Sequence, residues 1–186
     1  MSSPKSGQPM DIENEVARAV ENEGDLMDMA YVMEAESAER YAELADQMQI
    51  HNNHDVAELF VKLAAIEGKQ AEKVAGGEGV AARPGRKPWD YKWLDPVSPE
   101  VTGSDEVHYL MTPHHALKMA LINEERAVDF YDAVARLTAS EEVRAAASEL
   151  AAEEREHVEL VQKLLNDYPE PDAGWDDDPD PTNAPA

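Results

Sequence analysis

The chain contains no cysteine, and this absence excludes several kinds of site. Without thiols, these residues can form neither a disulfide nor a thiolate-bound zinc or iron site. Basic residues are also scarce, because 16 Lys and Arg stand against 40 Asp and Glu and leave a formal charge of −24. This balance argues against nucleic acid as a partner, since nucleic acid favours basic surfaces. It suits a protein that attracts cations, although a well-solvated acidic surface is the commoner explanation.

Long apolar runs are missing as well. No stretch approaches the roughly 18 consecutive apolar residues of a membrane-spanning helix. The polar start MSSPKSGQPMD lacks the apolar core of a signal peptide. We therefore expect a cytoplasmic protein with no membrane partner. Its 186 residues suffice for one domain with a substantial core.

Proline is absent from two long segments, residues 10–83 and 114–168, although the chain has 12 prolines elsewhere. Because proline breaks helix interiors, these Ala-, Glu- and Leu-rich segments are predicted to be helical. Each has a polar interruption near its middle, which predicts two antiparallel helices joined by a short turn. The four predicted helices span residues 25–48, 54–75, 113–137 and 140–167.

A crossover at about residues 76–112 separates the two predicted hairpins. It can easily run along a 24-residue helix of roughly 36 Å, as a bundle with one long crossover requires. We therefore predict an all-α fold, a four-helix bundle over residues 25–168 built from two helical hairpins. Residues 1–24 form an N-terminal segment with room for a short helix, and the acidic, Pro-rich residues 169–186 are expected to be disordered. Three aromatic residues suggest that the crossover packs against the bundle: Trp89, Tyr91 and Trp93.

One sequence motif occurs twice in the chain, as AAIEGKQAEKV at residues 64–74 and as AAEEREHVELV at residues 151–161. Aligning the two copies pairs Glu67 with Glu154 and places Gln70 opposite His157. The helix before each copy carries a glutamate seven residues ahead of a tyrosine: Glu34 before Tyr41, and Glu124 before Tyr131. The chain is therefore predicted to use one helical hairpin twice.

Each predicted helix carries one glutamate in the middle of its apolar stripe, because residues three, four or seven apart share a helix face. These glutamates are Glu34, Glu67, Glu124 and Glu154. Burying one uncompensated carboxylate costs at least several kcal/mol, and four together also repel one another. No Lys or Arg stands near them on the stripes, so two divalent ions would supply the balancing charge, and oxygen donors with imidazole suit iron or manganese. An exposed position at the rim of each stripe is the alternative, but four symmetric positions favour a dinuclear metal site.

This pattern resembles the ligand set of the ferritin-like di-iron carboxylate proteins, in which two helices supply a Glu and two supply Glu-x-x-His. The stretch INEERAVDFYDAVARL is typical of the rubrerythrin-like branch that lacks a rubredoxin domain. The resemblance covers roughly residues 25–167. It implies two bridging glutamates, two terminal glutamates and one histidine as metal ligands: Glu67 and Glu154, Glu34 and Glu124, and His157.

The chain departs from that family at two positions and in its lack of cysteine. Gln70 stands in place of the second histidine; it stays in the predicted ligand set, but as a weaker ligand that would hold one ion more loosely. Ala127 occupies the place where full rubrerythrins are expected to carry an extra glutamate. Without cysteine there is no built-in rubredoxin, so any electron donor is expected to be a separate molecule.

The leading functional hypothesis is a non-haem di-iron oxidoreductase that oxidises Fe(II) or reduces O2 or peroxide. Its cofactor would be two Fe ions, with Mn as the alternative metal, and it would assemble as a homodimer. Tyr41 and Tyr131, close to the predicted ligands, are candidate catalytic residues, with plain core packing as the competing interpretation. Two other classes stay open: a protein that binds or delivers iron or manganese without turnover, which Gln70 favours, and a metal-free helical interaction protein that uses its acidic tail.

Overall fold

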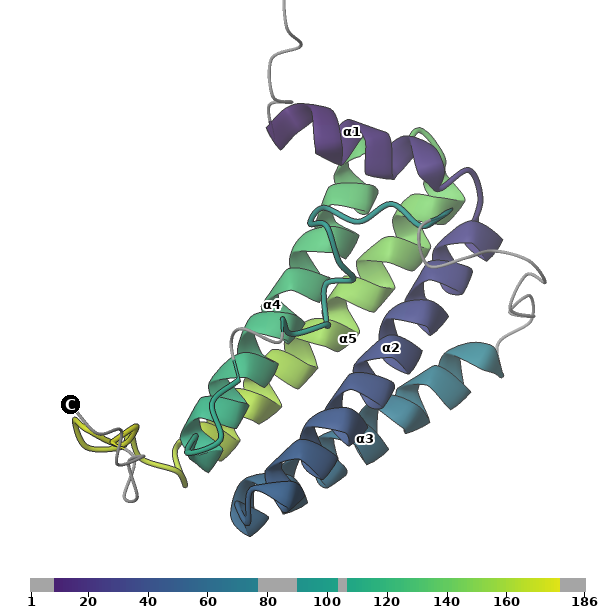
Figure 1. Cartoon of the computed structure of the whole chain (residues 1–186). Helices are drawn as coiled ribbons and strands as arrows, with labels where there is room; N and C mark the ends of the chain where they lie inside the picture. Colours follow the sequence, from purple (N-terminus) through teal and green to yellow (C-terminus); the bar gives the residue numbers. More distant parts are fainter. Residues whose placement is uncertain (1–8, 77–89, 104–106, 178–186) are drawn as a thin grey trace, which may run out of the picture.

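The computed structural model of the protein describes residues 9–76, 90–103 and 107–177 (Figure 1). These residues form five helices and no strand, which confirms the predicted all-α class. The helices are α1 (Pro9–Ala19), α2 (Glu23–Ile50), α3 (His54–Ala75), α4 (Pro113–Leu137) and α5 (Glu141–Leu165). The four long helices form two hairpins, α2 with α3 and α4 with α5, that lie side by side as a bundle (Figure 1). Each end of the four predicted helices lies within two residues of the observed end.

The turn between α2 and α3 is short because it uses asparagine twice. Asn52 adopts a left-handed backbone conformation with φ of 58°, which asparagine tolerates better than most residues. The side-chain amide of Asn53 then donates to the carbonyls of Tyr109, at 3.1 Å, and Met111, at 2.7 Å. These bonds tie the turn to the last residues of the crossover, just before α4.

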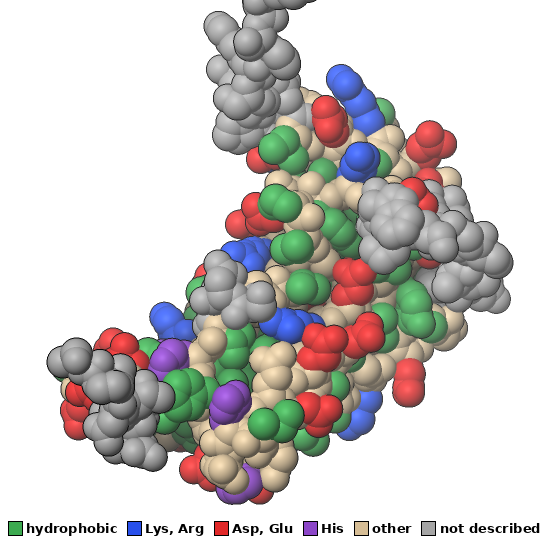
Figure 2. Space-filling view, viewed as in Figure 1, with side chains coloured by type: hydrophobic (Ala, Val, Ile, Leu, Met, Phe, Trp, Pro, Cys, Tyr) green, Lys and Arg blue, Asp and Glu red, His purple; other side chains and the backbone are tan. Residues whose placement is uncertain are grey.

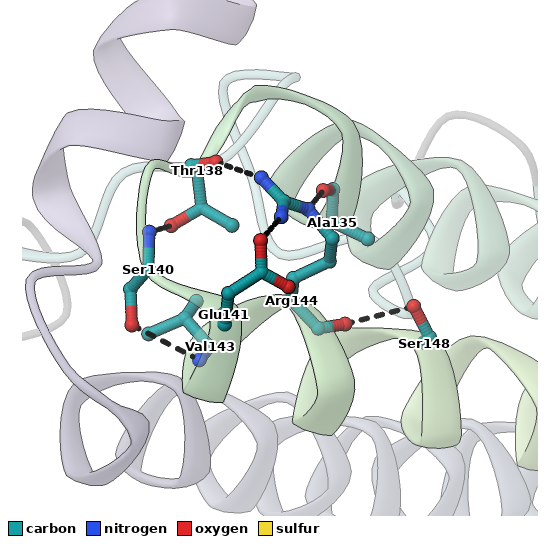
Figure 3. Close-up of polar contacts among 7 residues, drawn as sticks. All are labelled: Ala135, Thr138, Ser140, Glu141, Val143, Arg144 and Ser148. Atoms are coloured by element: carbon teal, nitrogen blue, oxygen red, sulfur yellow. Dashed lines mark hydrogen bonds and ion pairs between the residues drawn. The ribbon is translucent and has the colours of Figure 1, made fainter.

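Arg144 holds the turn between α4 and α5 (Figure 3). Its Nε donates to the carbonyl of Ala135 at 3.2 Å, and its Nη2 donates to the carbonyl of Thr138 at 2.6 Å. The last carbonyls of a helix have no partner within the helix, so the guanidinium satisfies the end of α4. The hydroxyl of Ser140 accepts from the backbone N–H of Val143 at 3.3 Å and caps α5.

The short helix α1 lies across one end of the bundle, near the α4–α5 turn (Figure 1). An ion pair joins Glu13 Oε2 to Arg136 Nη2 at 2.9 Å. Val16 and Val20, which are 1% and 3% exposed, belong to the hydrophobic core at that end. Helix α1 therefore covers the end of the bundle and shields its core from water.

The core consists of two hydrophobic clusters. The cluster near α1 includes Met29, Met33, Phe130 and Val134, and the cluster near the α2–α3 turn includes Leu44, Met48, Phe60 and Leu117. On every long helix, the buried glutamate of the repeat falls between the residues of one cluster and those of the other. A polar layer therefore divides the core at mid-height and is closed above and below by apolar side chains.

The crossover packs against the outside of the bundle. Trp93 lies 5.3 Å from Phe130 between ring centroids, and Tyr91 stacks on Trp93 at 6.0 Å. The Tyr91 hydroxyl donates to Asp28 Oδ2 at 3.2 Å. The predicted packing is thus confirmed for Tyr91 and Trp93, whereas Trp89 lies outside the described residues.

The tail, expected to be disordered from residue 169, is described as far as residue 177. Within that part, the Trp175 ring lies 4.0 Å from His115 and 5.4 Å from His108 between centroids. The expectation for residues 178–186 falls outside the described residues. Figure 2 shows acidic side chains spread over the surface, with histidines gathered at the end near the tail. Among the described helices, none combines the length and apolar character needed to cross a bilayer.

Candidate metal centre

The four glutamates of the repeat meet inside the bundle. Glu34 comes from α2, Glu67 from α3, Glu124 from α4 and Glu154 from α5, and each is between 2% and 5% exposed. Their helical spacing from apolar neighbours turns all four toward the common axis. The alternative of exposed glutamates at the rim of each stripe is therefore excluded.

Carboxylate and imidazole groups form two overlapping trios. In one trio, ligand atoms of Glu124, Glu154 and His157 all lie within 4.8 Å of one another. In the other, oxygen atoms of Glu34, Glu100 and Glu154 meet the same distance limit. Because Glu154 belongs to both, the two trios are adjacent. Such an arrangement suits a pair of metal ions that share one carboxylate.

Glu100 is a member of the cluster that the sequence did not reveal. It comes from the crossover, is 2% exposed, and neither of its oxygens has a hydrogen-bond partner among the described residues. The Asn123 side-chain amide, on α4, donates to the Glu100 carbonyl at 2.9 Å and to Thr102 Oγ1 at 3.0 Å. From α2, Arg40 Nε donates to the Thr102 carbonyl at 3.0 Å. These bonds hold the crossover beside the cluster.

Burial raises the pKa of three of the clustered carboxyl groups, Glu34, Glu67 and Glu100. Burial, followed by repulsion from Glu67 and Glu154, raises the pKa of Glu34 from 4.5 to about 10. Burial and repulsion from Glu124 raise the pKa of Glu67 to about 7. A hydrogen bond between the Glu34 and Glu67 carboxyl groups adds to the rise in the Glu34 pKa and lowers the pKa of Glu67. Burial also raises the pKa of Glu100 well above 4.5, with further repulsion from Glu34.

His157 provides the positive charge nearest to the carboxylates. Its Nδ1 lies 2.9 Å from Glu154 Oε2 and 3.5 Å from Glu124 Oε2. Hydrogen bonding to Glu124 and Glu154 raises the His157 pKa from 6.5 to about 11, against the opposing effect of burial. The other ring nitrogen, Nε2, lies 2.8 Å from Nε2 of Gln70. The ring therefore joins α5 to α3 as well as to the cluster.

Tyr41 and Tyr131 are both fully surrounded, at 2% and 0% exposed. The Tyr41 hydroxyl accepts a hydrogen bond from Asn123 Nδ2 at 3.2 Å. The Tyr131 hydroxyl has no hydrogen-bond partner among the described residues. Burial, followed by nearby carboxylates, raises the pKa of each phenol well above 10, the largest such effect being from Glu67 on Tyr41 and from Glu154 on Tyr131. Both phenols therefore remain protonated beside the cluster, and their catalytic role stays a prediction.

The donor set fits metal cations. Five buried carboxyl groups and one imidazole converge, and three of their oxygens lack a hydrogen-bond partner among the described residues: Glu34 Oε2 and both oxygens of Glu100. Buried polar atoms are normally paired, because leaving one unpaired costs about 1–3 kcal/mol. Divalent cations would supply partners for all of these oxygens at once.

The fold thus brings the predicted ligands together in one cluster, and Gln70 lies at the edge of this cluster. The half-buried amide of Gln70 contacts His157, and the role of Gln70 as a ligand stays a prediction. Glu100 was missed because it lies outside the repeat, in a Pro-rich segment with no periodicity from which burial could be inferred. The only signal was an acidic residue in a crossover that was expected to pack on the bundle.

Comparisons with known proteins agree with this fold. The family model described as Rubrerythrin matches residues 115–177. A similar solved structure is that of an uncharacterized conserved protein from Magnetospirillum magnetotacticum MS-1, which is 34% identical. The match covers 81% of this chain and 98% of that one, with a TM-score of 0.59. No protein with a curated description matches the chain significantly.

Proposed function

The chain belongs to the rubrerythrin family of ferritin-like proteins, and we propose that it is a non-haem di-iron oxidoreductase that oxidises Fe(II) or reduces O2 or peroxide. The observation that carries the proposal is the pair of trios that share Glu154 in the core. A site for a single ion would need one such trio. A bundle without metal would have no use for five carboxyl groups in the middle of its core.

Different residues of the cluster would bind the two ions. Glu154, common to both trios, would help to hold both ions, as would Glu67 from the opposite hairpin. Glu34 and Glu124 would each hold one ion, with His157 completing the position beside Glu124. When bound, iron supplies the electrons that O2 or peroxide takes up.

The protein's own groups would control protons and water at the centre. Glu34, Glu67 and Glu100 hold protons in the absence of cations and would release them as positive charge enters, since ligands must be deprotonated. The hydrophobic clusters above and below the polar layer exclude bulk water from it. Outside, a formal charge of −24 would raise the local concentration of Fe(II).

An anaerobic Fe(II) titration of the metal-free protein tests the centre. We expect two ions per chain, and a loss of binding in Glu154→Gln, which removes the shared carboxylate without changing the side-chain shape. Glu149→Gln is the matched control, because Glu149 is an exposed glutamate on the same helix. Failure of the wild-type chain to bind iron would overturn the proposal.

Oxidant kinetics test the reaction itself. The di-ferrous protein is mixed with O2 or with hydrogen peroxide, and iron oxidation is followed by absorbance. We expect at least one oxidant to oxidise the bound iron much faster than it oxidises Fe(II) in solution or in Glu154→Gln. Two tightly bound ions without any such acceleration would instead support a binding or delivery protein.

A further inference from the structure

No hydrogen bond among the described residues explains the position of Glu100, the fifth carboxyl group of the centre. It is 2% exposed, and both of its oxygens lack a hydrogen bond among the described residues. A buried acid with two unpaired oxygens destabilises the fold even in its neutral form. An apolar residue at this position would avoid that cost, so the acid itself requires another explanation.

The backbone on both sides of Glu100 is held firmly in place. The Asn123 amide bonds to the Glu100 carbonyl and to the Thr102 hydroxyl, and Arg40 bonds to the Thr102 carbonyl. Asn123 is itself buried, at 2% exposed, and also contacts the Tyr41 hydroxyl. The polar network thus fixes the main chain and leaves the Glu100 carboxyl group directed at Glu34 and Glu154.

Two positions in the chain offer the centre fewer donors than the repeat and the family pattern would predict. Gln70, which corresponds to His157, contacts the His157 ring. Ala127, fully buried, offers no donor atom. The trio that contains Glu34 is completed by the crossover, since an oxygen of Glu100 lies within 4.8 Å of oxygens of both Glu34 and Glu154.

From these contacts we propose that Glu100 is a metal ligand of the centre, on the ion held by Glu34 and Glu154. The inference rests on the proposed function, because it assumes that the centre holds two ions. It makes the two positions chemically different: one has imidazole among its donors, and the other has carboxylates alone. Carboxylate donors suit hard ions such as Fe(II) and Mn(II).

The test compares Fe(II) binding, without oxidant, in the wild-type chain and in Glu100→Gln. Equilibrium dialysis gives the number of ions and the affinity for each, so no turnover is required. We expect one ion in Glu100→Gln to bind at least about tenfold more weakly, since even partners of a ligand contribute about 10–100-fold to affinity, while the other ion keeps its affinity. Glu39→Gln, an exposed glutamate on α2, is the control for the change in net charge and should bind both ions as the wild type does.

Different outcomes separate this inference from the proposed function. Two ions bound with wild-type affinity in Glu100→Gln would overturn the role of Glu100 and leave the di-iron centre intact. No iron bound by the wild-type chain would overturn both. Circular dichroism establishes that Glu100→Gln is folded. If it is not, Glu100→Asp keeps the charge, withdraws the carboxylate by one methylene and should show the same selective loss.

Discussion

Gln70 and His157, which occupy corresponding positions in the two copies of the repeat, are in direct contact, with 2.8 Å between their Nε2 atoms. The contact joins α3 to α5 across the two hairpins. The opposite ring nitrogen of His157 faces Glu154 and Glu124. Metal-binding histidines commonly use one nitrogen for the metal and bond the other to a group that fixes the ring. Gln70 occupies the place of that second group.

We expect Gln70→Ala to weaken iron binding through His157. The imidazole would lose its contact with α3 and its fixed orientation, while all carboxylates remain. Affinity for one ion should fall about 10–100-fold, with two ions still bound at saturation. Anaerobic Fe(II) titration gives both quantities.

Gln162→Ala, an exposed glutamine on α5, is the control and should leave both affinities unchanged. A drop to one ion per chain in Gln70→Ala would contradict this account and would mean that Gln70 is itself an essential ligand. Unchanged binding would show that the contact with His157 has no influence on the metal.

The raised pKa values predict that the metal-free protein becomes less stable as pH rises. A group whose pKa is higher in the folded state stabilises the fold at low pH and loses that contribution as pH rises toward the folded value. For Glu67 this window runs from 4.5 to about 7, and for Glu34 from 4.5 to about 10. His157 acts in the same direction between 6.5 and about 11. The urea midpoint of metal-free protein should therefore be higher at pH 5.5 than at pH 8.

Glu67→Gln provides the check on this assignment, because an amide has no proton to lose. Its urea midpoint should fall less between pH 5.5 and pH 8 than that of the wild type. Added Fe(II), kept anaerobic, should stabilise the wild type more at pH 8 than at pH 5.5, since the ligands must be deprotonated. A midpoint that rises with pH in metal-free protein would contradict the prediction.

Gly68 predicts a stabilising substitution. It lies inside α3, next to Glu67, and a Cβ added there would meet nothing within 4 Å. Since glycine costs about 1 kcal/mol relative to alanine in a helix interior, Gly68→Ala should raise the free energy of unfolding by about 0.5–1 kcal/mol. Urea denaturation measures the change.

Ala65→Gly is the matched reverse substitution, at an exposed position one turn earlier in the same helix, and should destabilise the protein by a similar amount. A loss of stability in Gly68→Ala would mean that the space beside Gly68 is filled in the assembled protein, for example by a second chain.

Periodicity predicted the part of the centre that lies on helices. Glu34 and Glu154 could be identified because regular spacing places each on an apolar face, and the repeat showed that the four positions correspond. The helix ends followed from proline and from polar turn residues such as Asn52 and Asn53. These signals are local, so they can be read before the tertiary structure is known.

The crossover could not be predicted in the same way. Glu100 follows Ser98 and Pro99 in a segment without helical or alternating periodicity, so nothing local separates it from a solvated loop acid. Its burial depends on Asn123 and Arg40, which are distant in sequence. Nothing in the sequence around these two residues indicates which backbone groups they bond to. The contact of Gln70 with His157 was hidden for the same reason, because it exists only once both hairpins are packed.

The position of Glu100 in a connecting segment also has a geometric consequence. A duplicated hairpin, packed against its own copy, approaches twofold symmetry, and an axis between the copies would make the two halves of the centre equivalent. A crossover occurs once in the chain, and no rotation can generate a second one. Its carboxylate, close to Glu34 and Glu154, has no symmetry mate among the described residues beside Glu124. The centre is therefore asymmetric. One side carries His157 and the other carries Glu100 of the crossover, so the two sides present different groups to a molecule that binds there.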